Sequence, residues 1–256
     1  MLGRYVYSYF SKKGFPIRKI TGYRVTRESL SEIEQVLITH GIGHNTCVIN
    51  CIGSIPQRNA DINSYYVANS IFPQLLWQVC KKYGAKMIQP TTDCVFSGSK
   101  GTYTENDSHD ETGHYGISKS LGEPSGCTVI RTSIIGEELF NKKSFLEFVK
   151  NSDGMIQGWE NHAWNGITCL QYCKIIDYII ENNLFWEGVR HIYSPITVSK
   201  YELACMIRNT YNIQIYIQNK SSAPCDKTLA SVYRPIFEIP DISTQIEELK
   251  SFQLIE

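Results

Sequence analysis

A tyrosine and a lysine four residues apart are the strongest chemical signal in the sequence. They lie in the segment YGISK as Tyr115 and Lys119, and this spacing places both side chains on one face of a helix. A free phenol has a pKa of about 10 and is a poor acid at neutral pH. A neighbouring ammonium favours the phenolate, and lowering that pKa by about 3 units takes roughly 4 kcal/mol. A tyrosine tuned in this way can transfer a proton at a carbonyl or an alcohol.

A second polar segment, TTDCVFSG, occupies residues 91–98 and ends a predicted strand. Ligands bind at the carboxyl edge of parallel sheets, so the Thr92 hydroxyl would lie at that edge. There it can hydrogen-bond the same carbonyl oxygen that Tyr115 protonates. The structural alternatives are that Thr92 only caps the strand and that Tyr115 and Lys119 lie on a solvated helix face.

The elements that must position these residues are short apolar runs alternating with helical periodicity. We expect helices at 2–12, 27–39, 62–83 and 112–123, and strands at 16–20, 46–53, 86–96 and 127–136. The run at 46–53 is continuously apolar and ends in glycine, which is typical of a strand buried on both faces. The alternation predicts an α/β fold with a Rossmann-like, doubly wound parallel sheet.

After residue 136 the alternation loosens. Helices expected at 143–151, 167–182 and 199–211 alternate with strands expected at 189–194 and 213–218. We therefore divide the chain into residues 1–136, which hold the parallel sheet, and residues 137–256, a smaller α+β region. The last 25 or so residues carry mixed signals.

Composition narrows the function classes. The 256 residues are 42% apolar, and 25 basic residues balance 25 acidic ones, which indicates a globular chain and argues against a nucleic-acid partner. No apolar run approaches the roughly 20 residues of a membrane span. Nine cysteines lie mostly in apolar stretches without a CxxC pair, so we expect free buried thiols, a reducing cytoplasm and no metal site.

Three motifs in combination resemble the extended short-chain dehydrogenases/reductases, and more closely the dTDP-4-dehydrorhamnose reductase-like family of sugar-nucleotide reductases. They are TTDCVFSG at 91–98, YGISKSLGE at 115–123 and RTS at 131–133. The resemblance covers roughly residues 1–210. It implies an NADP-dependent oxidoreductase that reduces a nucleotide-linked 4-keto-6-deoxy sugar in deoxysugar synthesis, for example of rhamnose for a surface polysaccharide.

The resemblance also implies a role for each matching residue. Tyr115 would donate the proton, Lys119 would lower its pKa and bind the nicotinamide ribose, and Thr92 would orient the ketone. Hydride would pass from the nicotinamide to C4 of the sugar. The substrate, linked to UDP or dTDP, would also contact Asp93, Ser133 and Trp164, although a buried core position is the alternative for the tryptophan. Residues 1–136 would bind NAD(P) and residues 137–256 the substrate, and a homodimer is an open expectation.

The cofactor end departs from the family pattern. The family begins with a strand and a G-x-x-G-x-x-G loop that holds the pyrophosphate, whereas this chain starts MLG, so only Gly3 matches the last glycine. Three interpretations stay open: a start assigned at an internal methionine, a natural non-catalytic relative, or a strand supplied by a partner. Ile52 and Gly53 would lie along the cofactor, while Asn69 is either structural or cofactor-facing.

Cofactor and substrate preference follow from smaller signals. Arg18, Lys19 and Arg24 could attract a 2′-phosphate, which favours NADP(H) and leaves NADH open. Many dehydrorhamnose reductases carry tryptophan after Arg-Thr-Ser, and Ile134 stands there in this chain, which leaves other 4-keto-6-deoxy sugars open.

Two rival functions keep the same fold. The first is a non-catalytic, nucleotide-binding regulatory subunit similar to that of methionine adenosyltransferase, which the incomplete glycine loop would fit. The second is an epimerase or dehydratase; dehydratases of this fold usually carry Asp-Glu after the threonine, and Asp93-Cys94 stands there in this chain.

Overall fold

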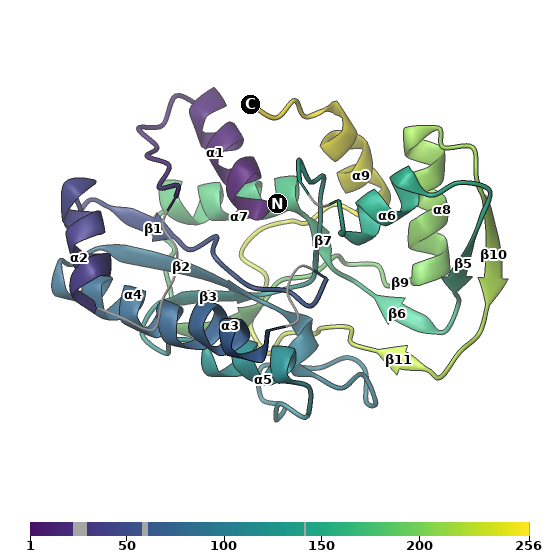
Figure 1. Cartoon of the computed structure of the whole chain (residues 1–256), viewed down its shortest axis with the longest axis horizontal. Coiled ribbons are helices and arrows are strands. Elements are labelled where there is room, and N and C mark those ends of the chain that lie inside the picture. Colours follow the sequence, from purple (N-terminus) through teal and green to yellow (C-terminus); the bar gives the residue numbers. More distant parts are fainter. Residues whose placement is uncertain (23–29, 58–60, 141, 256) are drawn as a thin grey trace.

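A four-stranded, fully parallel sheet forms the centre of the fold in the computed structural model, which describes residues 1–22, 30–57, 61–140 and 142–255 (Figure 1). The strand order is β1-β2-β3-β8. The strands are β1 (Cys47–Ile49), β2 (Lys86–Thr91), β3 (Thr128–Arg131) and β8 (Gly188–His191). The prediction of an α/β fold with a Rossmann-like parallel sheet is confirmed.

Helices cover both faces of this sheet. Met87 and Val129 pack toward α2 (Leu30–Thr39) and α4 (Phe72–Lys82). Their neighbours Ile88 and Ile130 belong to the opposite cluster, which also holds residues of α1 (Leu2–Lys12) and α7 (Cys169–Glu181). Successive strand residues face opposite sides, so neighbouring apolar residues of one strand pack into the clusters on the two faces of the sheet.

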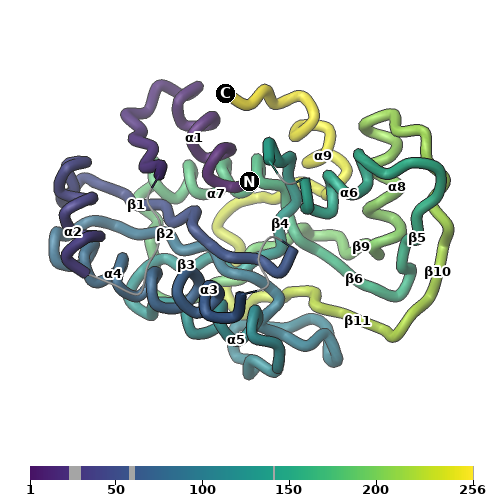
Figure 2. Tube along the Cα trace, in the orientation of Figure 1, coloured from purple at the N-terminus to yellow at the C-terminus, as the bar shows by residue number. Residues whose placement is uncertain are grey.

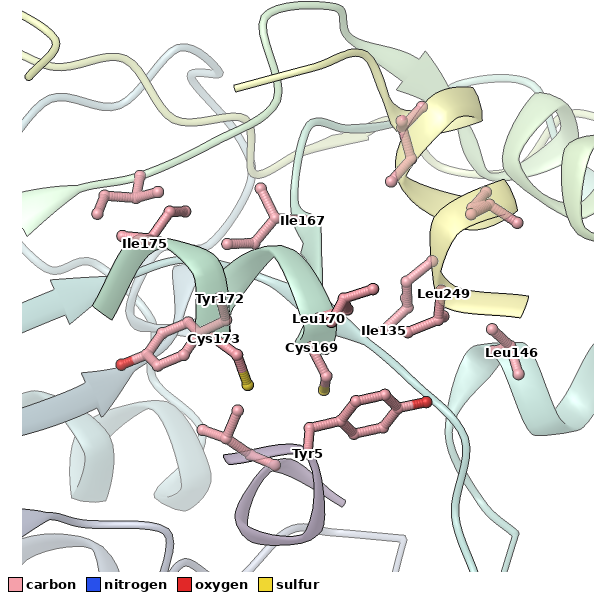
Figure 3. Close-up of a cluster of buried hydrophobic side chains, with 14 of the residues drawn as sticks. Tyr5, Ile135, Leu146, Ile167, Cys169, Leu170, Tyr172, Cys173, Ile175 and Leu249 are labelled. Carbon is pink, nitrogen blue, oxygen red and sulfur yellow. The ribbon is translucent and has the colours of Figure 1, made fainter. Parts of the chain in front are cut away.

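The cluster between α1 and α7 is the larger core (Figure 3). Tyr5 of α1 and Cys169 of α7 are both fully buried and would both crowd a side chain added at Gly136. Helix α9 (Ile242–Ser251), which the sequence patterns did not predict, packs on the same core through Leu249. The segment after it runs back to α1, where the Ile255 amide donates to the Ser8 hydroxyl at 2.9 Å (Figure 2).

Short strands and helices follow the first part of the chain, and helices form where they were expected near 143–151, 167–182 and 199–211. Helices α6 (Phe145–Asn151) and α8 (Lys200–Tyr211) lie beside three small sheets at the right of Figure 1. These sheets pair β5 (Met155–Trp159) with β10 (Tyr216–Lys220), β4 (Ile134–Ile135) with β7 (Ile167–Thr168), and β6 (His162–Trp164) with both β9 (Val198–Ser199) and β11 (Cys225–Asp226).

Four sequence-based expectations about strands were wrong. The strand expected at 127–136 is divided into β3, in the central sheet, and β4, which pairs with β7 in another sheet. The strand expected within 189–194 belongs to the central sheet as β8, so the chain returns there from the second region. Strand β1 is half-buried rather than buried on both faces, because among the described residues it pairs only with β2, at the sheet edge. Residues 16–20 form no ladder; Arg18 donates to the His40 carbonyl and the Lys19 ammonium lies over the Tyr7 ring, which holds this segment between α1 and α2.

The helix expected at 62–83 forms with one irregularity. It consists of α3 (Ile62–Tyr66), a π-helical turn η1 (Val67–Ile71) and α4. The turn η1 lies against α5 (His114–Leu121), where a side chain on Gly122 would overlap the Asn69 carbonyl oxygen. Glycine at 122 therefore permits the close approach of the two helices.

A buried ion pair ties the end of α5 to the sheet. Arg131 of β3 donates from Nε to Glu123 at 3.1 Å and from Nη2 at 2.6 Å, and both side chains are almost fully buried. The guanidinium also faces Nε2 of His191 and Nε2 of His109, each at 2.7 Å. Burial and the nearby guanidinium lower the pKa of both histidines, so both accept hydrogen bonds as neutral rings.

Replacing Glu123→Gln should lower the free energy of unfolding by about 3 kcal/mol, because it leaves the Arg131 charge buried without its counter-ion. Urea titration followed by circular dichroism measures the change. The matched control is Glu248→Gln, which removes the half-exposed pair with Lys174 at 2.7 Å and should cost less than about 1 kcal/mol. Equal small losses in both variants would contradict the structural role given to the buried pair.

Candidate active site

The candidate site lies at the carboxyl ends of β2 and β3. Thr92 follows β2 directly and caps the short 3-10 turn η2 (Asp93–Val95). Its hydroxyl oxygen accepts from the Cys94 amide at 3.2 Å and donates to Asp93 at 3.0 Å. Thr92 therefore has the capping role that was the structural alternative. It also lies at the edge of the sheet, where its chemical role was expected.

Tyr115 lies in the first turn of α5 and reaches the Thr92 side chain. Burial raises the pKa of the Tyr115 phenol, the nearby Cys94 and Asp93 raise it further, and a side-chain hydrogen bond with Thr92 lowers it. The Tyr65 ring stands edge-on to the phenol at a centroid separation of 6.1 Å. The expected lowering of this pKa by Lys119 is therefore wrong for the protein without ligands, because burial outweighs the groups that favour the phenolate.

Lys119 lies one helical turn after Tyr115 and points at Gly53. Its Nζ would be 3.1 Å from a Cβ placed on Gly53, so the absence of a side chain there makes room for the ammonium. Burial lowers the pKa of Lys119 to about 8, opposed by Cys94 and Glu123. The lysine is thus held at the end of β1, where the cofactor was expected.

Asn69 is a structural residue of this site. Its amide accepts from the Ser54 amide at 2.9 Å and donates to the Ser54 carbonyl at 2.9 Å and to the Ser118 hydroxyl at 3.1 Å. The side chain is buried and joins the loop after β1 to α5. This arrangement decides between the two interpretations of Asn69 in favour of the structural one.

The other predicted cofactor residues line the same edge. Gly3, at the start of α1, would place a Cβ 3.1 Å from Cβ of Cys51, so α1 begins beside the end of β1. Ile52 is exposed, and its amide donates to the Asn50 side chain at 3.0 Å. Gly3, Ile52, Gly53 and Lys119 therefore surround one edge, and their contacts with a cofactor stay a prediction. Arg24 lies outside the described residues.

The predicted substrate residues are brought together only in part. Asp93 adjoins Thr92 and is buried. Trp164 is also buried, and its indole N–H donates to the Ser133 hydroxyl at 2.8 Å, which favours the core alternative for this tryptophan. Its neighbour Asn165 exchanges two hydrogen bonds with the backbone of Leu229 and is structural as well.

Sequence reasoning missed two residues of this site, Tyr65 and Lys200. Tyr65 comes from α3 and its position depends on the π-helical turn that follows. The segment SKYE at 199–202 has the capping-box spacing, so the sequence could have placed Lys200 at the start of a helix but not beside Trp164.

Among the described residues there is neither a cluster of metal-binding side chains nor a helix that could span a membrane. No three histidine, cysteine or acidic side chains in that part of the chain gather closely enough to hold a metal ion. No helix there has the length and apolarity needed to cross a membrane.

Comparison with known proteins agrees with this geometry. The family model described as the RmlD substrate binding domain matches residues 27–154, half of the chain. The chain belongs to the RmlD-like family. This family lies within the extended short-chain dehydrogenases/reductases that the three motifs resemble.

Curated relatives of the chain fall into two groups. Methionine adenosyltransferase 2 subunit beta of Rattus norvegicus is 26% identical over 182 residues, which cover 63% of this chain and 48% of that protein. The spore coat polysaccharide biosynthesis protein SpsK of Bacillus subtilis is 32% identical over 130 residues, covering 45% and 46%. The chain thus spans about half the length of the curated relatives it matches.

Among solved structures, a dTDP-4-dehydrorhamnose reductase of Bacillus anthracis, in complex with NADP, superposes with a TM-score of 0.81. The alignment covers 98% of this chain and 95% of that chain at 18% sequence identity. At this identity the likeness establishes the fold, including the parallel sheet, and no more.

Replacing Lys119→Met should stabilise the protein at pH 7 by up to about 3 kcal/mol, because the buried ammonium has a pKa of about 8 when folded against about 10.4 unfolded. The unfolded state binds this proton more tightly, so the penalty is complete below pH 8 and disappears as the pH approaches 10.4. Thermal unfolding at pH 7, 8, 9 and 10 measures it. Lys174→Met, at a half-exposed position, is the control, and parallel curves for wild type and Lys119→Met would contradict the prediction.

Proposed function

We propose that this chain is an NAD(P)H-dependent reductase of a nucleotide-linked 4-keto-6-deoxy sugar. The single observation that carries the proposal is that Thr92, Tyr115 and Lys119 lie together at the carboxyl edge of the sheet. Tyr115 forms a hydrogen bond with Thr92, and Lys119 lies beside Gly53. These three groups suit the reduction of a ketone. The hydroxyl and the phenol can hydrogen-bond the ketone oxygen, and the ammonium can bind the hydride donor.

Each residue has a distinct task in this reaction. Thr92 and Tyr115 hydrogen-bond the ketone oxygen, and Tyr115 gives it a proton as it becomes an alkoxide. The raised pKa keeps Tyr115 protonated and ready to donate. The Lys119 ammonium stabilises the phenolate that remains after Tyr115 has given up its proton, and it would donate hydrogen bonds to a ribose hydroxyl of the cofactor.

A nicotinamide cofactor fits the edge formed by Gly3, Ile52, Gly53 and Lys119. The space left by the missing side chain at Gly53 and the exposed Ile52 leave this edge open to a flat ligand beside the ammonium. When bound, such a cofactor supplies the hydride. The Bacillus anthracis structure in complex with NADP supports the choice of NADPH over NADH.

The substrate side of the proposal rests on the second region. Residues 137–256 would bind the sugar nucleotide, linked to UDP or dTDP, and residues 1–136 would bind the cofactor with β8 completing the sheet. The name of SpsK and that of the dTDP-4-dehydrorhamnose reductase support a product used in polysaccharide synthesis. The nine free cysteines fit work in a reducing cytoplasm.

A second candidate function is a non-catalytic nucleotide-binding subunit. The match to methionine adenosyltransferase 2 subunit beta over 182 residues favours it. Such a protein could retain the binding edge around Gly53 without reducing a sugar. Oxidation of NADPH in the presence of substrate separates the two functions.

Replacing Tyr115→Phe should lower kcat by about 10²–10⁴-fold, because it removes the proton donor and leaves the ring. NADPH oxidation, followed at 340 nm with UDP- and dTDP-linked 4-keto-6-deoxy sugars, measures it. NADPH binding should not change, and Tyr66→Phe, on the helix opposite α5, is the matched control with near-normal kcat. Binding of NADPH without turnover of any such sugar by the wild type would favour the non-catalytic subunit.

The pH profile of kcat/KM should fall as the pH rises through about 8, because Lys119 then loses its charge in the free enzyme. Tyr115 should not contribute to this fall, because burial raises its pKa. A steady-state profile from pH 6 to 10 tests this, with Lys119→Arg expected to move the fall to higher pH. A flat profile in the wild type would show that the charge on Lys119 is dispensable.

A further inference from the structure

Lys200 is placed against two aromatic rings beside the candidate site. Its ammonium lies 4.9 Å from the centroid of the Trp164 ring and 5.0 Å from that of Phe145. None of the ion pairs within the described residues involves Lys200. The ammonium therefore lies against aromatic faces without a direct ion pair among the described residues, and the Asp93 carboxylate acts on its charge only from a greater distance.

The position of Lys200 in its helix is also unfavourable for a cation. It is the first residue of α8, whose N-cap is Ser199 in a complete capping box with Glu202. The positive end of the helix dipole lies at this terminus and repels an ammonium. Burial lowers the pKa of Lys200, because removing the charged ammonium from water is unfavourable. A cation in this unfavourable position indicates a binding site for an anionic ligand.

The surroundings of Lys200 connect it to the reacting groups. The ring beneath it, Trp164, donates to the Ser133 hydroxyl at 2.8 Å, and Ser133 lies just after the end of β3. Asp93 and Cys94, which act on the charge of Tyr115, act on that of Lys200 as well. Lys200 thus lies on the wall of the same site, on the side formed by the second region.

The charges around the Asp93–Cys94 turn leave an excess of positive charge. Lys119, Lys200 and Lys227 all interact with Cys94 electrostatically. Lys227 is paired with Glu111 at 3.0 Å, Asp93 acts on both Lys200 and Lys227, and Glu123, which acts on Lys119, is itself paired with Arg131. The site is therefore suited to an anionic ligand.

A neighbouring cavity of about 490 Å³ indicates how such a ligand would lie. Ser199, the residue before Lys200, and Cys225, which acts on its charge, both line the cavity. Glu160, Glu202 and Asp226 line it too, so it repels phosphate and accepts hydrogen bonds from hydroxyls. A nucleoside suits this cavity, and its phosphates suit the lysine at the edge.

We propose that Lys200 binds the diphosphate of the nucleotide-linked substrate, with the nucleoside in the cavity beside Ser199 and the sugar directed toward Thr92 and Tyr115. The identity of this ligand as substrate rests on the proposed function. Binding of a nucleoside diphosphate at Lys200 can be measured independently of any reduction.

The test uses UDP and dTDP as probes in isothermal titration calorimetry, with NADPH binding followed by nicotinamide fluorescence. Lys200→Gln should weaken UDP or dTDP binding by about tenfold or more, because a charge-assisted contact is lost. Lys200→Arg should keep most of the affinity. Lys174→Gln, which removes a lysine charge from the half-exposed pair with Glu248, should bind the probes as the wild type does.

Each outcome decides the assignment. Two results with the probes would overturn it: unchanged binding in Lys200→Gln, or no binding by the wild type. An equal loss of NADPH affinity in Lys200→Gln would also overturn it, because the cofactor phosphates or the fold would then depend on Lys200. Weakened probe binding with normal NADPH binding supports it. If that result is obtained but no 4-keto sugar nucleotide is reduced, the Lys200 site stands and the proposed reductase activity fails.

Discussion

The ion pair between Glu123 and Arg131 is the interaction on which the arrangement of the site depends. It joins Glu123, which follows α5, to Arg131, the last residue of β3, and both side chains are almost fully buried. The close approach at Gly122 and the Asn69 amide bind α5 to the adjoining turn η1 and to the loop after β1. Since α5 carries Tyr115 and Lys119, these contacts set how both approach the sheet edge.

Burial dominates the electrostatics of the site. It raises the pKa of Tyr115 and lowers those of Lys119 and Lys200, so in each case the neutral form is favoured. The three groups surround the Asp93–Cys94 turn, which brings one carboxylate to a region rich in ammonium groups. Burying ammonium groups beside few carboxylates is costly, and an anionic ligand of the kind proposed above would reduce that cost.

Fold and function are separable in this family. Relatives named as a subunit of methionine adenosyltransferase and as a polysaccharide biosynthesis protein match overlapping parts of the chain, and a reductase structure superposes on nearly all of it. A shared sheet brings the same edge to all such proteins, while the side chains at the edge decide the chemistry. Here Thr92, Tyr115 and Lys119 meet at that edge, which is the reason to favour the enzyme.

Periodicity and motif spacing, which are local properties of the chain, predicted the fold class, most helices and the three residues at the sheet edge. The other features depend on contacts between residues that are distant in the chain. Residues 16–20 look like a strand but have no ladder partner among the described residues, and β8 joins the central sheet from the second region. The pKa of Tyr115 rises rather than falls, and Lys200 becomes part of the site, because both depend on burial by residues distant in the chain. Desolvation and long-range pairing leave no local pattern in the sequence, so these features could be established only once the chain was folded.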